Sequence, residues 1–366
     1  LSDPQIAYAG SMVAVYRSED GGRNWRQVAG QGGDGWGPAN MQAGFPIDFQ
    51  VDPADPDRIF ANNYGGGNFL STDGGQTWGN SSKGYTGASV KRLAVAAADP
   101  ALVVAGVLSG FYISKNAGED WAGLYPAGGW HAAEIHPDNA DVILGAVAPA
   151  TYIFVTSDGG QTWDLNDDAG VGAENTWRSI RFAPSNPSII YAGSCTVNIP
   201  EANQEDPGAR GIYVSSDSGV SWSAANDDTS KTANVWDLDV AGGDALIVMA
   251  ATTNLGVLKT TDGGKNWTQM NTGLPPDIKM LSIAMHPKDS SIALVGAQGN
   301  GIYRTTDGGK NWTASQTGLV AEADITDIVF NPQNPDQVWA ADMTSGIYRS
   351  DDGGLTWNQE NSGLLN

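Results

Sequence analysis

The pattern Ser/Thr-x-Asp-x-Gly-x-x-Trp recurs along the chain and constrains its fold more than any other feature. It occurs seven times, and an eighth copy carries Asn116 in place of the Asp. The copies end at Trp25, Trp78, Trp121, Trp163, Trp222, Trp267, Trp312 and Trp357. Successive Trp residues are 53, 43, 42, 59, 45, 45 and 45 positions apart. Such a period is typical of a fold built from stacked structural repeats.

Each copy predicts a tight β-turn. The Asp carboxylate can accept hydrogen bonds from backbone N–H groups of its own turn, and the Gly supplies a left-handed backbone conformation. The Trp side chain then anchors the turn on the core through its large apolar area. We therefore interpret the repeated Asp, Gly and Trp residues as structural rather than catalytic.

The stretch between two copies predicts four short strands, which we name A to D in chain order. In the module from Leu281 to Gln316 they are Leu281–Met285, Ile292–Ala297, Gly301–Arg304 and Trp312–Gln316. The same order recurs in the modules that start at Trp177 and Ile325. Four antiparallel strands every ~45 residues are the signature of a β-propeller blade.

The whole chain, residues 1–366, is therefore predicted to be one all-β domain, a single β-propeller of eight blades, with seven blades as the alternative. The predicted modules span approximately residues 1–30, 47–82, 90–125, 130–166, 177–226, 235–271, 280–316 and 325–361. The first module has only strands B to D, because Leu1–Pro4 aligns with the turn after strand A, so 31 strands are expected. An open strand edge is a pairing hazard, and we expect the natural chain to begin earlier.

The repeats resemble the Asp-box (bacterial neuraminidase) repeats of sialidases, xyloglucan-cleaving glycoside hydrolases, sortilin-type receptors and photosystem II assembly-factor propellers. The even spacing is most similar to the last three. The resemblance implies a propeller fold, but these families perform unrelated functions on one scaffold. The sialidase motif (Phe/Tyr)-Arg-Ile-Pro is absent, and the xyloglucan hydrolases use two propellers where this chain has one.

The charge balance excludes some partners. The chain has 19 basic and 41 acidic residues, a net charge of −22, whereas nucleic-acid binding requires a basic patch. No apolar run is long enough to span a membrane. Cys195 is the single cysteine, so no internal disulfide can form. The composition favours a secreted, periplasmic or cell-surface protein, and we expect it to belong to a longer chain or a larger assembly.

The long loops should share one face. In a blade of consecutive antiparallel strands, the B–C and D–A connections leave the face opposite to the A–B and C–D connections, and every Asp box is a C–D turn. The long connections are B–C or D–A loops: residues 30–46 (which include Trp36), 166–176, 196–210 and 226–234. Because loops carry function on a rigid scaffold, this is the predicted interaction face.

Aromatic residues begin three consecutive A strands and form the candidate ligand-binding site. Trp130 and Trp177 lie seven residues before the Pro of their modules, and Trp236 is placed similarly. The residues that follow them, His131, Arg178 and Asp237, would supply the polar groups of a site. The rings would bind a sugar or a partner's side chain; inter-blade packing is the alternative. Trp36 completes the predicted ligand-binding residues.

The acidic residues of the sequence give weaker evidence for a functional site than these aromatic residues do. Asp48 and Asp327 share a position in strand A and are the best glycosidase candidates, while Glu134 and Arg181 are expected to form an inter-blade ion pair. Acidic loops at residues 166–168 and 226–228 could hold Ca²⁺, although solvated loops are the simpler interpretation. No catalytic residue, metal ligand or cofactor is assigned.

The sequence therefore favours a non-catalytic extracytoplasmic scaffold that binds a protein partner through the loop face. The alternative is a carbohydrate-binding or glycoside hydrolase propeller, for which a pair of facing carboxylates would be needed.

Overall fold

The structure is a computed structural model. It describes residues 6–11, 14–30, 36–37, 46–52, 55–63, 68–81, 90–96, 99–107, 110–125, 129–148, 152–166, 176–195 and 211–361.

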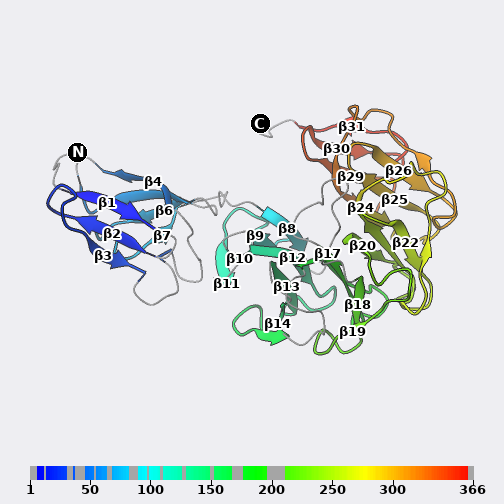
Figure 1. Cartoon of the computed structure of the whole chain (residues 1–366), viewed down its shortest axis with the longest axis horizontal. Coiled ribbons are helices and arrows are strands. Elements are labelled where there is room, and N and C mark those ends of the chain that lie inside the picture. The colour runs from blue at the N-terminus through cyan, green and yellow to red at the C-terminus, as the bar shows by residue number, and fades with distance from the viewer. Residues whose placement is uncertain are drawn as a thin grey trace. The chain divides into compact units, whose positions relative to one another are not determined.

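Eight antiparallel sheets, the predicted blades, follow one another along the chain (Figure 1). Blade 1 contains β1 (Ala7–Gly10), β2 (Val15–Ser18) and β3 (Arg26–Ala29). Blade 2 contains β4 (Pro46–Val51), β5 (Ile59–Asn63), β6 (Asn68–Ser71) and β7 (Gly79–Asn80). Blade 3 contains β8 (Val90–Val95), β9 (Val103–Val107), β10 (Gly110–Ser114) and β11 (Ala122–Tyr125). Blade 4 contains β12 (Gly129–Ile135), β13 (Ile143–Ala148), β14 (Ile153–Thr156) and β15 (Asp164–Asn166).

The second half of the chain repeats this order. Blade 5 contains β16 (Thr176–Phe182), β17 (Ile190–Cys195), β18 (Ile212–Ser215) and β19 (Ser223–Ala224). Blade 6 contains β20 (Val235–Val240), β21 (Val248–Thr252), β22 (Gly256–Thr260) and β23 (Thr268–Gln269). Blade 7 contains β24 (Met280–Met285), β25 (Ala293–Ala297), β26 (Gly301–Thr305) and β27 (Thr313–Ala314). Blade 8 contains β28 (Ile325–Phe330), β29 (Val338–Asp342), β30 (Gly346–Ser350) and β31 (Asn358–Gln359).

The predicted number of strands is confirmed. The described residues form 31 strands in eight sheets, of which the first has three strands and the other seven have four. In every sheet the strands pair with their neighbours in chain order. No helix that is long and apolar enough to cross a membrane occurs in the described part of the chain.

The Asp boxes fold as the sequence predicts. In blade 6, Thr260 Oγ1 donates to Asp262 Oδ1 (2.8 Å) and accepts from the N–H of Gly264 (3.0 Å). The N–H of Asn266 donates to the same carboxylate at 2.9 Å. Gly263 and Gly264 have φ of 75° and 90°, in the left-handed region that glycine favours. The turn thus satisfies its own polar groups.

The box Trp residues of the last three blades pack into the core. Trp267, Trp312 and Trp357 are at most 4% exposed, and Trp267 Nε1 donates to the carbonyl of Ala225 in blade 5 at 2.8 Å. Trp25 of blade 1 is different: it is 44% exposed, and its Nε1 donates to Gly22 of its own turn. The predicted anchoring role therefore does not extend to Trp25.

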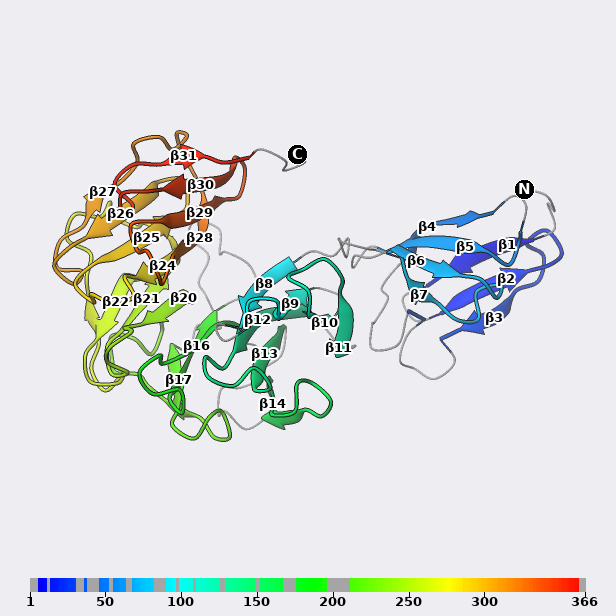
Figure 2. The same ribbon diagram turned by 180° about the vertical axis from the view of Figure 1, so that it is seen from behind.

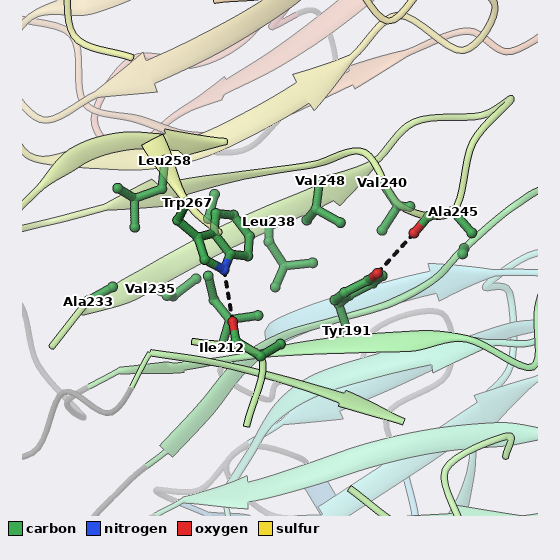
Figure 3. Packing of buried hydrophobic residues seen from close by; sticks show 13 residues of the cluster. Tyr191, Ile212, Ala233, Val235, Leu238, Val240, Ala245, Val248, Leu258 and Trp267 are labelled. Atoms are coloured by element: carbon green, nitrogen blue, oxygen red, sulfur yellow. Dashed lines mark hydrogen bonds between the residues drawn. The ribbon is translucent and has the colours of Figure 1, made fainter. Parts of the chain in front are cut away.

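Apolar side chains of adjacent sheets form the core. Figure 3 shows the cluster between blades 5 and 6, in which Val235, Leu238 and Leu258 are fully buried. Each such side chain contributes roughly 1.5–3 kcal/mol through its removal from water. The Tyr191 hydroxyl donates to the Ala245 carbonyl at 2.9 Å, which joins the B strand of one blade to the A–B turn of the next (Figure 3).

The chain divides into two compact units. Residues 1–148 and 154–164 form the first unit, which holds most of blades 1 to 4. Residues 149–153 and 165–366 form the second, which holds blades 5 to 8. Within the second unit the A strands β16, β20, β24 and β28 lie side by side in this order (Figure 2).

Candidate functional site

Every A strand of the described chain contains a β-bulge at the same place. In each A strand the ladder to the B strand omits one residue close to the strand's start; for example, Val235 lies opposite Thr252 and Asp237 opposite Ala251, so that Trp236 is skipped. The skipped residues are Ile47, Lys91, His131, Arg178, Trp236, Leu281 and Thr326. A bulge leaves its extra residue outside the ladder and redirects its side chain.

Two of these bulge residues meet in the second unit. The guanidinium carbon of Arg178 lies 3.5 Å from the centroid of the Trp236 ring, so β16 and β20 are joined by a cation–π contact. Trp236 is 7% exposed and Arg178 is half-buried. Such contacts contribute ~0.5–2 kcal/mol, depending on how far they are desolvated. The pair therefore holds a guanidinium over an indole ring at the start of two adjacent A strands.

A buried polar network connects the strands at the residues that directly follow this pair. Asp237 accepts hydrogen bonds from Ser179 Oγ (2.8 Å), Arg181 Nη2 (3.1 Å) and the N–H of Ile283 (3.2 Å). Its side chain is 3% exposed and that of Arg181 is 17% exposed. The carboxylate thus connects the A strands of blades 5, 6 and 7. A buried charge is tolerated when it is paired and hydrogen-bonded in this way.

Trp130 and Trp177 are core residues in the structure. Both are 0% exposed. Trp130 lies 4.7 Å from Phe111 and 5.0 Å from Phe154, between ring centroids, and Trp177 lies 5.1 Å from Tyr213 in an edge-to-face arrangement. Their burial agrees with the packing alternative and leaves no ring face on which a sugar could stack.

Trp36 is also buried in the part of the chain that the structure describes. It is 2% exposed and lies 5.1 Å from Trp78 and 5.7 Å from Phe69, between ring centroids. Most of the long loop to which it belongs, residues 31–35 and 38–45, is outside the described residues. The same holds for residues 167–175 and 196–210 of the predicted interaction face.

The strand register corrects the alignment of Trp236. Trp130 and Trp177 immediately precede the bulge, where blade 6 has Val235, whereas Trp236 occupies the bulge position of His131 and Arg178. The sequence alignment relied on the Pro that lies seven residues after Trp130 and Trp177. Blade 6 has Gly242 at the corresponding position, seven residues after Val235, and Trp236 was therefore aligned one residue away from its true position. Within the predicted set, the structure shows Arg178 in contact with Trp236, and the binding role of the set stays a prediction.

The register also places the remaining acidic candidates. Asp237 shares its position, directly after the bulge, with Asp48 and Asp327.

Sequence reasoning missed the ion pair between Asp237 and Arg181, which are 56 positions apart. Only the register of two adjacent blades could have revealed it. The pairing of Arg181 with Glu134 stays a prediction, since these residues belong to different units.

The acidic loop at residues 226–228 is organised by hydrogen bonds. Asp227 accepts from the N–H groups of Thr229 and Ser230 through Oδ1, and from the N–H of Trp267 through Oδ2 (2.8 Å). Burial would raise the pKa of Asp227, but these hydrogen bonds outweigh it and lower the pKa below its usual value. Asp228 pairs with Lys231 at 2.7 Å. Within the described residues no cluster of His, Cys, Asp or Glu is arranged to hold a metal ion.

Comparison with known proteins supports the fold. The model of the Sortilin-Vps10 family, described as "Sortilin, neurotensin receptor 3", matches residues 255–364. YCF48 from Cyanidioschyzon merolae superposes with a TM-score of 0.53 at 14% identity, covering 86% of this chain and 97% of that one.

The chain is an Asp-box β-propeller.

A second structure, YCF48 bound to D1 peptide, superposes on this propeller with a TM-score of 0.52 at 12% identity, covering 83% of this chain and 91% of that one. The GH74 enzyme of Niastella koreensis gives a lower TM-score of 0.40 at 13% identity, covering 98% of this propeller and 68% of the enzyme. No curated protein matches this propeller.

Proposed function

We propose that this propeller is a non-catalytic, extracytoplasmic scaffold that binds a protein partner where the A strands begin. The observation that carries the proposal is the stacked pair of Arg178 and Trp236. Trp and Arg are enriched among the few residues that dominate the affinity of protein interfaces. Because the Trp236 ring already holds the guanidinium of Arg178 in place, little conformational entropy would be lost when a partner binds.

The structure of YCF48 bound to D1 peptide supports a peptide-binding function for propellers of this fold. The extracytoplasmic location rests on composition alone, namely few Lys and many Asp, Asn, Ser and Thr residues. The sugar-binding alternative is weakened, because Trp130 and Trp177 are buried and one face of Trp236 is covered by Arg178.

The proposal can be tested with a phage-displayed library of random peptides selected on the whole chain. We expect Arg178→Ala and Trp236→Ala each to weaken the binding of selected peptides at least ~10-fold, as truncation of a hot-spot residue does. Arg349→Ala is the matched control: this arginine is on β30 and pairs with Asp351 at 2.6 Å, and its loss should leave binding unchanged. Thermal unfolding of each variant establishes that it is folded.

Two outcomes would contradict the proposal. One is peptide binding that neither variant at the pair affects. The other is saturable binding on a glycan array that is lost in Trp236→Ala, which would favour the carbohydrate-binding alternative.

A further inference from the structure

The B–C turn of blade 7 contains the sequence Asn300-Gly301, and no other Asn in the chain precedes a Gly. Residues 298–300 connect β25 to β26, with Ala297 opposite Gly301 in the ladder. Asn300 is exposed, whereas Gly301 is buried. Because glycine has no Cβ atom, its backbone nitrogen is the one that the side chain of a preceding Asn reaches most easily. A B–C turn, and thus the predicted interaction face, therefore carries a chemically reactive pair.

This turn also holds the D–A loop that leads from blade 7 to blade 8. Gln316 Nε2 donates to the Asn300 carbonyl at 2.6 Å, and the N–H of Gly301 donates to the Ala323 carbonyl at 3.1 Å. A Cβ atom added to Gly301 would lie 3.4 Å from Leu319 Cδ1. The turn and the loop are thus packed closely, and the two residues of the reactive pair make the hydrogen bonds between them.

The Asp-Gly pairs of the boxes have a similar sequence but are protected. Asp262 and Asp307 each precede a glycine, and hydrogen bonds from the Asn four residues further on lower the pKa of both carboxyl groups to about 2. An ionised carboxylate resists attack by a nucleophile, so these pairs react slowly at neutral pH. The Asn300 side chain is a neutral amide, whose Nδ2 donates to the Gln298 carbonyl at 2.9 Å, and its carbonyl carbon lacks this protection.

We propose that Asn300 is a site of spontaneous deamidation, with water as the co-reactant. The Gly301 nitrogen attacks Cγ of Asn300 and a C–N bond forms. The bond between Cγ and Nδ2 breaks, and Nδ2 leaves as ammonia with the proton of the Gly301 N–H. Water then opens the resulting succinimide at one of its two imide bonds, which yields either Asp or isoaspartate at position 300. This site goes beyond the proposed function, because it involves neither Arg178 nor Trp236.

The two products differ in their effect on the fold. Blades 8 and 6 have Ser345 and Leu255 at the position of Asn300, so the turn accepts different side chains there and Asp should leave it intact. In isoaspartate the main chain runs through Cγ and is longer by one carbon. The N–H of Gly301 then cannot keep both its place in the ladder and its bond to Ala323. Isoaspartate should therefore release the D–A loop from the turn.

The proposal can be tested by incubating the folded chain at mildly alkaline pH beside the peptide Ala-Gln-Gly-Asn-Gly-Ile-Tyr of residues 297–303. Peptide mass mapping locates the deamidated residue, and a protein isoaspartyl methyltransferase measures isoaspartate. We expect the folded chain to react at Asn300 several-fold more slowly than the peptide, because the bond of Gly301 to Ala323 must first open locally. Gln316→Ala removes the bond to the Asn300 carbonyl and should accelerate the reaction of the folded chain several-fold.

Matched variants separate this reaction from general instability. Gln269 Nε2 donates to the Leu255 carbonyl at 3.3 Å in the equivalent turn of blade 6, so Gln269→Ala should leave the rate at Asn300 unchanged. Asn300→Ser copies blade 8 and should form no isoaspartate in this turn. Hydrogen exchange of residues 319–323 should be faster in the isoaspartate fraction than in the unreacted chain. Deamidation at Asn300 in urea alone, an equal rate in Gln316→Ala and wild type, or unchanged exchange in the isoaspartate fraction would overturn the proposal.

Discussion

The Asp box shows how a single carboxylate can organise a whole turn. Asp262 receives hydrogen bonds from the hydroxyl of Thr260, from the backbone of Asn266 and from the Asn266 side chain, the last at 2.7 Å. These bonds, those from Asn266 above all, lower the pKa of Asp262 to about 2. Asp20, Asp158, Asp307 and Asp352 have pKa values of about 2 in the same environment.

These low pKa values predict acid sensitivity. A carboxyl group with a pKa of about 2 in the folded state and ~3.9 in the unfolded state stabilises the fold fully above pH ~4. This stabilisation is lost as the pH falls toward 2. We expect the free energy of unfolding, measured by urea titration with Trp fluorescence, to decrease between pH 4 and pH 2. Asp262→Asn should make this decrease smaller.

The chain provides its own control for this prediction. Asn116 occupies the Asp position in blade 3, where its Oδ1 accepts from the N–H of Asp120 at 2.9 Å. Its Nδ2 donates to the carboxylate of Asp120 at 3.0 Å, so the intact box is restored by Asn116→Asp together with Asp120→Asn, and this double variant should make the decrease between pH 4 and pH 2 steeper. Identical pH profiles for wild type, Asp262→Asn and the double variant would show that the boxes do not control acid stability.

At the scale of the strands, the A strands of the second unit are connected through Asp237. Asp237→Ala would remove three hydrogen bonds and leave the guanidinium of Arg181 without this carboxylate. Breaking a buried pair costs ~3–5 kcal/mol, and we expect about 3 kcal/mol because Arg181 is partly exposed. Chemical denaturation measures this loss. Asp228→Ala removes an ion pair whose Asp is 98% exposed, and should cost less than ~1 kcal/mol; equal losses would contradict the role of Asp237.

The strands also show where prediction from sequence succeeds and where it ends. The repeated turn chemistry and the apolar alternation predicted the order of all the strands, because both are local properties. The position of Trp236 was misaligned by one residue, because blade 6 has Gly242 where the modules of Trp130 and Trp177 have the Pro on which the alignment relied. The network of Asp237, Arg181 and Ser179 was not found, because it depends on how separate sheets are placed side by side.

At the scale of the whole molecule, the acidic excess should limit stability. The chain carries a net charge of −22, and like charges repel one another in the compact state. The box carboxylates do not relieve this charge, because their partners are neutral N–H and O–H groups.

Salt should therefore stabilise the fold. Raising NaCl from 0.01 M to 0.15 M shortens the Debye length from about 30 Å to about 8 Å, so we expect the unfolding midpoint in scanning calorimetry to rise by a few degrees at pH 7. Choline chloride at the same ionic strength should have the same effect if screening is the cause. A midpoint that falls with salt would show that attractive ion pairs outweigh the repulsion.

The bulge at the start of every A strand has a consequence for how such a molecule can evolve. Seven equivalent positions carry seven different amino acids, Ile47, Lys91, His131, Arg178, Trp236, Leu281 and Thr326. Each residue lies outside the ladder, so a mutation there changes the local chemistry while the hydrogen bonds that define the blade persist. Where such a residue also reaches solvent, as Lys91, Arg178 and Thr326 do, selection could thus change what the protein recognises one blade at a time, on a scaffold that stays the same.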